Sequence, residues 1–133
     1  MELNEIVAEW IRFARQDYES AVHLYETKHP RPLELICNLA QQAVEKALKA
    51  FLIAKDSAPP KSHDLNQLCE LCEAFDKRFG EVAPQCSSLT KYGVMARYPF
   101  EMEILDDETN MALQRAAKAL SFIEAQLKNA RPY

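Results

Sequence analysis

The side chains best suited to chemistry form a polar row within residues 41–50. Four of them recur at spacings of three, four and seven, which places them on one face if the segment is helical. They are Gln42, Glu45, Lys46 and Lys49. Two interpretations are open. The row is either a solvated face, with a Glu45–Lys49 ion pair worth about 0.3–0.5 kcal/mol, or a polar stripe that lines a groove or a dimer interface.

A second group surrounds a single arginine near residues 92–99. Arg97 falls in the last turn of the helix expected there, where a cation interacts favourably with the helix dipole. Alternatively, its rigid fork of donors binds a phosphate while Tyr92 or Tyr98 stacks on a base.

His63 opens a His-Asp-Leu turn at the expected start of another helix. An imidazole at a helix N-terminus can donate to neighbouring backbone or help to bind an anion, or it can simply belong to the entry turn. Asp64 is the predicted N-cap, with Gln67 three residues later in the capping-box position.

Four potential zinc ligands also occur: Cys69 and Cys72, with His63 before them and Cys86 after them. The two close cysteines lie inside a helical pattern, and no second closely spaced ligand pair exists. We therefore expect buried free thiols, with no metal and no other cofactor.

Apolar residues that recur every three or four positions predict the elements that carry these side chains. We expect helices at about 4–29, 33–55, 63–79, 82–97 and 107–128. Two glycines in the whole chain are typical of an all-α protein, and Gly93 on an apolar stripe predicts a close helix crossing. The sequence thus predicts an all-α, up-and-down bundle of about five helices, four long and one short, in a single domain over 1–133.

Composition and charge restrict the possible partners. With 48% hydrophobic and 27% charged residues the chain is globular, and its net charge of −4 argues against a general nucleic-acid coat. Any nucleic-acid contact should be small and close to the basic group Lys46, Lys49, Lys55 and Lys61. No apolar run reaches about 18 residues and the N-terminus is acidic, so we expect a cytoplasmic protein with reduced thiols and no membrane contact.

Taken in order, several of these features resemble one known family. They are Trp10, Ala14, Asp17 and Ala21, the 37–50 string CNLAQQAVEKALKA, a proline-containing loop, His63-Asp64-Leu65 and Ala96-Arg97-Tyr98-Pro99. Over nearly the whole chain the pattern is similar to the HEPN domain, in the branch often encoded beside minimal nucleotidyltransferases. The resemblance implies a helical bundle that often forms homodimers and a role in nucleotide or RNA biology.

Many HEPN proteins are metal-independent ribonucleases, frequently toxins, whose motif is an arginine followed after four to six residues by a histidine. This sequence lacks that motif. Arg15 and His23 come nearest, with seven residues between them, and no histidine follows Arg97. The general base that the resemblance implies is missing from its place, so we expect no complete ribonuclease site.

Three functions remain as hypotheses. The first is a nucleotide-binding protein or nucleotidyltransferase partner in a toxin–antitoxin or defence-type system. Its nucleotide site would consist of Arg97, Tyr98, Tyr92, His63, Lys46, Lys49, Gln42 and Glu45. The second is an RNA-cleaving toxin with a rearranged catalytic site of Arg97 and His63. The third is a non-catalytic module whose 41–50 stripe forms a homodimer or partner surface.

Overall fold

A computed structural model describes residues 2–94 and 103–129, and these residues form helices and loops without a strand. The elements are α1 (Leu3–Thr27), α2 (Leu33–Ala54), α3 (Leu65–Phe75), the 3₁₀ turn η1 (Lys77–Val82), α4 (Ala83–Leu89), the 3₁₀ turn η2 (Thr90–Gly93) and α5 (Asp106–Asn129). The predicted all-α bundle is confirmed. Within the described ranges, no helix is long and apolar enough to cross a membrane.

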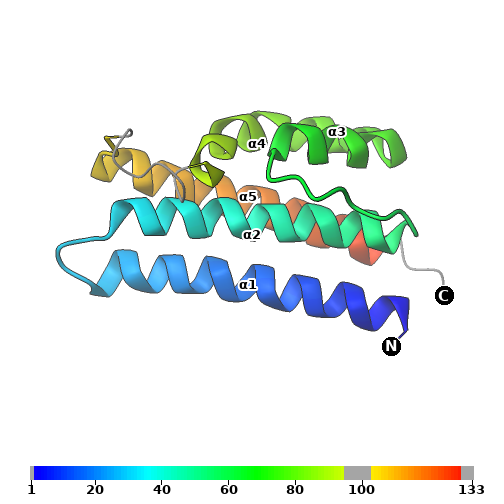
Figure 1. Ribbon diagram of the computed structural model, residues 1–133, viewed down its shortest axis with the longest axis horizontal. Helices are drawn as coiled ribbons and strands as arrows, with labels where there is room; N and C mark the ends of the chain where they lie inside the picture. The colour runs from blue at the N-terminus through cyan, green and yellow to red at the C-terminus, as the bar shows by residue number, and fades with distance from the viewer. Residues whose placement is uncertain (1, 95–102, 130–133) are drawn as a thin grey trace.

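The three long helices pack side by side, and the short elements α3 to η2 cover the side of α2 that faces away from α1 (Figure 1). The α1 helix runs antiparallel to α5. Arg15 in its middle donates two 2.5 Å bonds to Glu124, while Arg31 just after it reaches Asp106 at the start of α5. These ion pairs connect α1 to α5 along the length of both helices.

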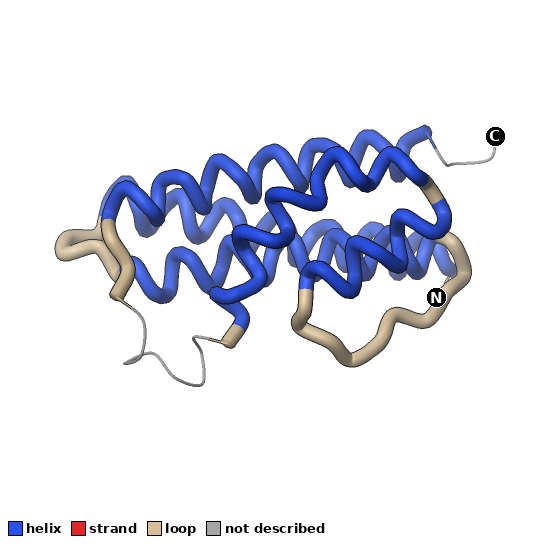
Figure 2. The backbone as a smooth tube through the Cα atoms, turned by 90° about the horizontal axis from the view of Figure 1, so that it is seen from above, coloured by secondary structure: helices blue, strands red, loops and turns tan. Residues whose placement is uncertain are grey.

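The connection from α2 to α3 turns back on itself. Residues 55–64 run back along α2, so that α3 begins beside the middle of α2 and follows the same direction (Figures 1 and 2). The register of the contacts agrees: Gln41 bonds to the carbonyl of His63, and further along both helices Leu48 O accepts from Cys72 Sγ. This return loop brings His63 next to the polar row of α2.

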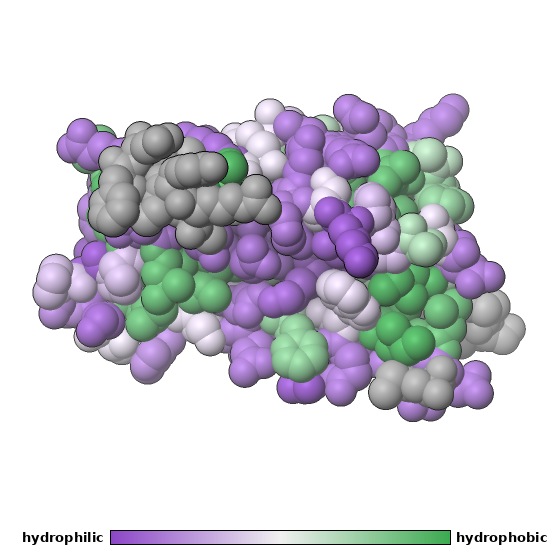
Figure 3. All heavy atoms as spheres, in the orientation of Figure 1, coloured by the Kyte–Doolittle hydropathy of each residue, from purple (hydrophilic) through white to green (hydrophobic). Residues whose placement is uncertain are grey.

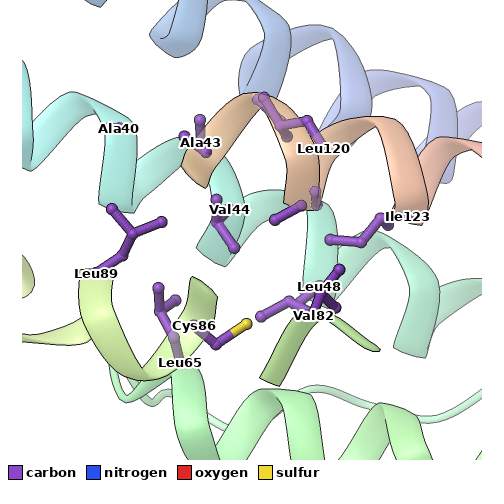
Figure 4. Close-up of a cluster of buried hydrophobic side chains, with 14 of the residues drawn as sticks. Ala40, Ala43, Val44, Leu48, Leu65, Val82, Cys86, Leu89, Leu120 and Ile123 are labelled. Atoms are coloured by element: carbon purple, nitrogen blue, oxygen red, sulfur yellow. The ribbon is translucent and has the colours of Figure 1, made fainter. Parts of the chain in front are cut away.

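Small side chains let α1 and α2 pack closely, because Ala14 and Ala21 of α1 are fully buried, as are four alanines of α2. Larger apolar side chains from α2, α3, α4 and α5 fill the opposite side of α2 (Figure 4). At one end of this core, the ring of Phe79 lies 4.4 Å from that of Phe51 and 5.1 Å from that of Phe122, centroid to centroid. The core thus surrounds α2 on nearly every side.

The predicted fourth helix is wrong as one continuous element. Its apolar stripe is correct, since Val82, Cys86 and Leu89 are all fully buried, but the α-helix covers only seven residues and changes to 3₁₀ turns at both ends. A spacing of three residues fits a 3₁₀ turn as well as an α-helix. The described residues therefore form three long α-helices and two short ones.

The Asp64 cap is confirmed, with its side chain accepting from Asn66 N at 2.9 Å. The backbone N–H of Asp64 donates to Ser62 Oγ at 3.1 Å, so Ser62 takes the place predicted for Gln67. The cap holds the turn that carries His63.

Figure 3 shows mainly hydrophilic side chains across the middle of one face, with apolar patches towards both ends. Large apolar side chains with more than a third of their surface exposed occur on several elements and include Leu3, Phe13, Leu35, Leu71, Phe75 and Met111.

Candidate functional site: a buried carboxylate beneath an exposed histidine

Glu45, in the middle of α2, is the centre of the polar row. Its side chain is only 6% exposed. One oxygen accepts from Gln41 Nε2 at 3.1 Å, the other accepts from Lys49 Nζ at 3.0 Å, and His63 Nδ1 lies 3.0 and 3.1 Å from the two oxygens. Gln41, Glu45 and Lys49 are four residues apart, which stacks them on one side of the helix.

Burial alone would raise the pKa of Glu45, but the donors oppose it. Hydrogen bonds from Lys49, Gln41 and His63 outweigh the loss of hydration, and they lower the pKa of this carboxyl below its ordinary value of 4.5. Glu45 is therefore an ionised carboxylate inside the fold, paired with Lys49, whose side chain is 10% exposed.

His63 differs from its neighbours because 61% of its side chain is exposed. Nδ1 points inward to Glu45, and the two ring nitrogens lie on opposite edges of the imidazole, so Nε2 is on the outward edge. A buried carboxylate that holds one nitrogen of an imidazole sets the orientation of the ring and the function of the other nitrogen. This arrangement can bind an anion or accept a proton at Nε2.

Two contacts join the His63 turn to η2. Thr90 Oγ1 accepts from Leu65 N at 3.0 Å and donates to Asp64 Oδ1 at 3.4 Å. On the other side of the turn, a Cβ added to Gly93 would lie 3.0 Å from Gln41 Nε2, the same nitrogen that donates to the His63 carbonyl at 3.2 Å. Gly93 thus lies close to Gln41, but as part of a 3₁₀ turn against one side chain of α2 rather than at the predicted crossing of two helices.

Residues 7–126 match the HEPN domain family. The chain belongs to the HEPN family.

Two solved structures are similar to this HEPN domain. A protein from Thermus thermophilus shares 26% sequence identity at a TM-score of 0.74, covering 90% of this chain and 96% of that one. An archaeal HEPN homologue has the same fold at 22% identity and a TM-score of 0.71, covering 91% of this chain and 97% of that one. Among curated proteins, none matches.

In this HEPN domain, the solvated-face interpretation of the polar row is wrong for Glu45 and Lys49, because both are buried within the chain. The same burial removes them from any homodimer surface formed by α2. Lys46 lies on the neighbouring side of the helix and forms an ion pair with Asp17 of α1. Gln42 is half-buried. The four residues therefore do not form one continuous face.

Tyr92 is not available for stacking on a base. Only 2% of it is exposed, and its hydroxyl donates to Glu108 at the start of α5. Burial and this hydrogen bond to a carboxylate both raise the pKa of Tyr92. Arg97 and Tyr98, the other two members of the predicted group, lie outside the described residues.

The cysteines are free and buried in the core of the domain, as predicted. Two thiols donate to backbone carbonyls at 3.5 Å, Cys69 to Phe79 O and Cys72 to Leu48 O. Burial raises the pKa of Cys72, which keeps its thiol protonated. In the described part of the chain, no three His, Cys, Asp or Glu side chains form a group that could bind a metal ion.

Sequence reasoning did not include Gln41 in the site. Its position four residues before Glu45 was a usable signal, because a side chain there shares the helix face of Glu45 and Lys49. The site that the structure brings together is therefore Gln41, Glu45, Lys49 and His63, bordered by Gly93.

Proposed function

We propose that this HEPN domain binds the phosphate of a nucleotide or of an RNA at His63, as the nucleotide-binding component of a toxin–antitoxin or defence-type system. The observation that carries the proposal is an exposed imidazole held by a buried carboxylate. Such an arrangement costs desolvation of Glu45, and packing alone gives no reason to orient a ring that is 61% exposed.

The charges of the region support a small site. Lys46 is paired with Asp17 and Lys49 with Glu45, so neither ammonium group is available as a separate phosphate ligand. In this proposal, the phosphate contacts are made by His63 and Arg97, and Tyr98 supplies the stacking surface. The net charge of −4 fits a ligand with few phosphates better than a long duplex.

A thermal-shift titration with ATP, GTP, CTP, UTP and a short RNA tests the proposal. A ligand that binds only the folded state adds about 2.7 kcal/mol at a hundredfold excess over its Kd, which should raise the Tm by several degrees. His63→Ala and Arg97→Ala should each abolish the shift, whereas His29→Ala, which alters an exposed histidine elsewhere, should keep it. No shift with any ligand, or the same shift in all three variants, would contradict the proposal.

RNA cleavage is a second candidate function, and the Glu45–His63 contact favours it. An imidazole whose Nδ1 is held by a carboxylate is suited to act as a general base at Nε2. Metal-independent cleavage of RNA should then disappear in both His63→Ala and Arg97→Ala and persist with a chelator present. Cleavage that survives His63→Ala would exclude this mechanism.

The partners implied by the family are also proposals. We infer a homodimer and a nucleotidyltransferase partner that contact mainly the outer surface of α1, because most of α2 is buried. A groove of about 360 Å³ with an apolar lining supports this choice, formed by Ile6, Glu9, Trp10, Phe13 and Lys46. Light scattering at micromolar concentration tests the dimer, and Phe13→Glu should convert a dimer formed at this groove to monomers.

A further inference from the structure

The orientation of His63 follows from the groups on its inner side. Among the described residues, the hydrogen bonds of its ring are made to the Glu45 carboxylate, whose oxygens lie 3.0 and 3.1 Å from Nδ1. An ionised carboxylate can only accept hydrogen bonds, so Nδ1 must carry a proton to make this contact. In the neutral ring, Nε2 then carries none, and the site presents a lone pair to solvent.

The charges beneath His63 neutralise each other without a charge on the imidazole. Glu45 carries one negative charge and Lys49 one positive charge, 3.0 Å apart and both buried. From the other elements, Asp64 faces Thr90 and its own helix N-terminus, and Lys91 of η2 is paired with Glu108. A proton gained by His63 therefore adds one positive charge at the outer edge of a neutral pair.

A phosphate dianion has no proton to donate, so it cannot bond to a bare Nε2 lone pair. It can bond to Nε2–H of the imidazolium, whose Nδ1–H donates to the Glu45 carboxylate on the inner side. We propose that Glu45 is a positioning residue that fixes the Nδ1–H form of His63, and that a phosphomonoester binding at Nε2 takes up one proton from solution. This inference rests on the proposed function for its second half only.

The first half is tested without ligand. Nitrogen-15 NMR of the imidazole rings at alkaline pH distinguishes the two neutral tautomers. His63 should be in the Nδ1–H form, while His23 and His29, which make no side-chain bond to a carboxylate within the described residues, serve as internal references. The Nε2–H form at His63 in the wild type would overturn the inference, whatever the protein binds.

The variant Glu45→Gln/Lys49→Met removes the buried pair together and keeps the shape of the side chains. Its His63 should lose most of the preference for the Nδ1–H form, because an amide can either accept from Nδ1–H or donate to a bare Nδ1, whereas a carboxylate can only accept. If the preference stays unchanged in this folded variant, Glu45 does not position the ring. Glu26→Gln, which neutralises an exposed carboxylate near the end of α1, is the matched control and should leave the His63 signals in place.

The second half is tested by calorimetry with AMP at about pH 8, roughly two units above the second pKa of a phosphate group. Titrations in two buffers of different ionisation enthalpy give the number of protons taken up, which should be close to one. The double variant should bind AMP about tenfold more weakly, the size of effect expected for a hydrogen bond that loses its charged partner. Binding without proton uptake overturns this half. No binding at all contradicts the proposed function, while the tautomer result still decides the role of Glu45.

Discussion

Replacing Glu45 with glutamine is the sharpest test of how the site is built. The substitution keeps the shape of the side chain but leaves the Lys49 ammonium, 10% exposed, without its carboxylate. Removing one partner of a buried ion pair costs about 3–5 kcal/mol. The glutamine carbonyl can still accept one hydrogen bond, from Gln41 or His63, so we expect the lower end, about 3 kcal/mol. For a chain of this length the loss corresponds to about 10 °C in Tm.

Urea unfolding followed by circular dichroism measures the effect. Adding Lys49→Met to Glu45→Gln should recover most of the lost stability, because replacing a buried pair by apolar groups of similar volume is often neutral. Glu26→Gln, at an exposed position near the end of α1, should leave the unfolding curve unchanged. The reasoning is refuted if Glu45→Gln changes the free energy of unfolding by less than about 1 kcal/mol, or if the double variant is less stable than the single one.

Three further predictions concern the same network and the core. Gly93→Ala should destabilise the fold by about 1–2 kcal/mol in urea unfolding, because the added Cβ would press on the buried amide of Gln41. Gly80→Ala is the control and should cost little stability, because its Cβ would meet only the end of a flexible glutamate side chain. Since folding lowers the pKa of Glu45, its stabilisation is present above pH 4.5 and should be lost as the pH falls below that value. In a pH series of unfolding midpoints, the wild type should therefore lose more stability in acid than Glu45→Gln/Lys49→Met, which starts close to it at neutral pH. Phe79→Ala should cost about 3–5 kcal/mol in the same assay, since its fully buried ring contacts two other aromatic rings. The first expectation is contradicted if both glycine variants lose the same unfolding free energy, and the second if the difference between the two unfolding midpoints stays constant across the pH series. The third is contradicted if Phe79→Ala lowers the unfolding free energy by less than about 1 kcal/mol.

The spacing of the apolar residues in the sequence was enough to predict the long helices. The buried positions Ala14 and Ala21 in α1, and Leu120 and Ile123 in α5, follow the spacing of three and four that defines an amphipathic helix. The same signal located the buried residues between 82 and 89. It did not locate the ends of α4, because α and 3₁₀ turns share a spacing of three.

The sequence indicated most of the residues of the site, but not how they are buried or which of them contact one another. Glu45 and Lys49 have the spacing of an exposed ion pair, and nothing local distinguishes that from a buried one. The 55–64 loop turns back along α2 and brings His63 onto Glu45, a contact over 18 residues that the local spacing does not indicate. Tyr92 is the reverse case. Its sequence context predicted an exposed ring that could stack on a base, but its hydroxyl donates to Glu108 and the ring lies in the core.

The most direct test of phosphate binding at His63 is a map of backbone amide shifts upon titration with AMP and with a short RNA. Binding at this site should move the signals of His63, Asp64 and Glu45 first and those of Gly93 with them, and His63→Ala should remove the changes. Shifts confined to the α1 groove around Trp10 and Phe13, or no shifts at all, would contradict a phosphate site at His63.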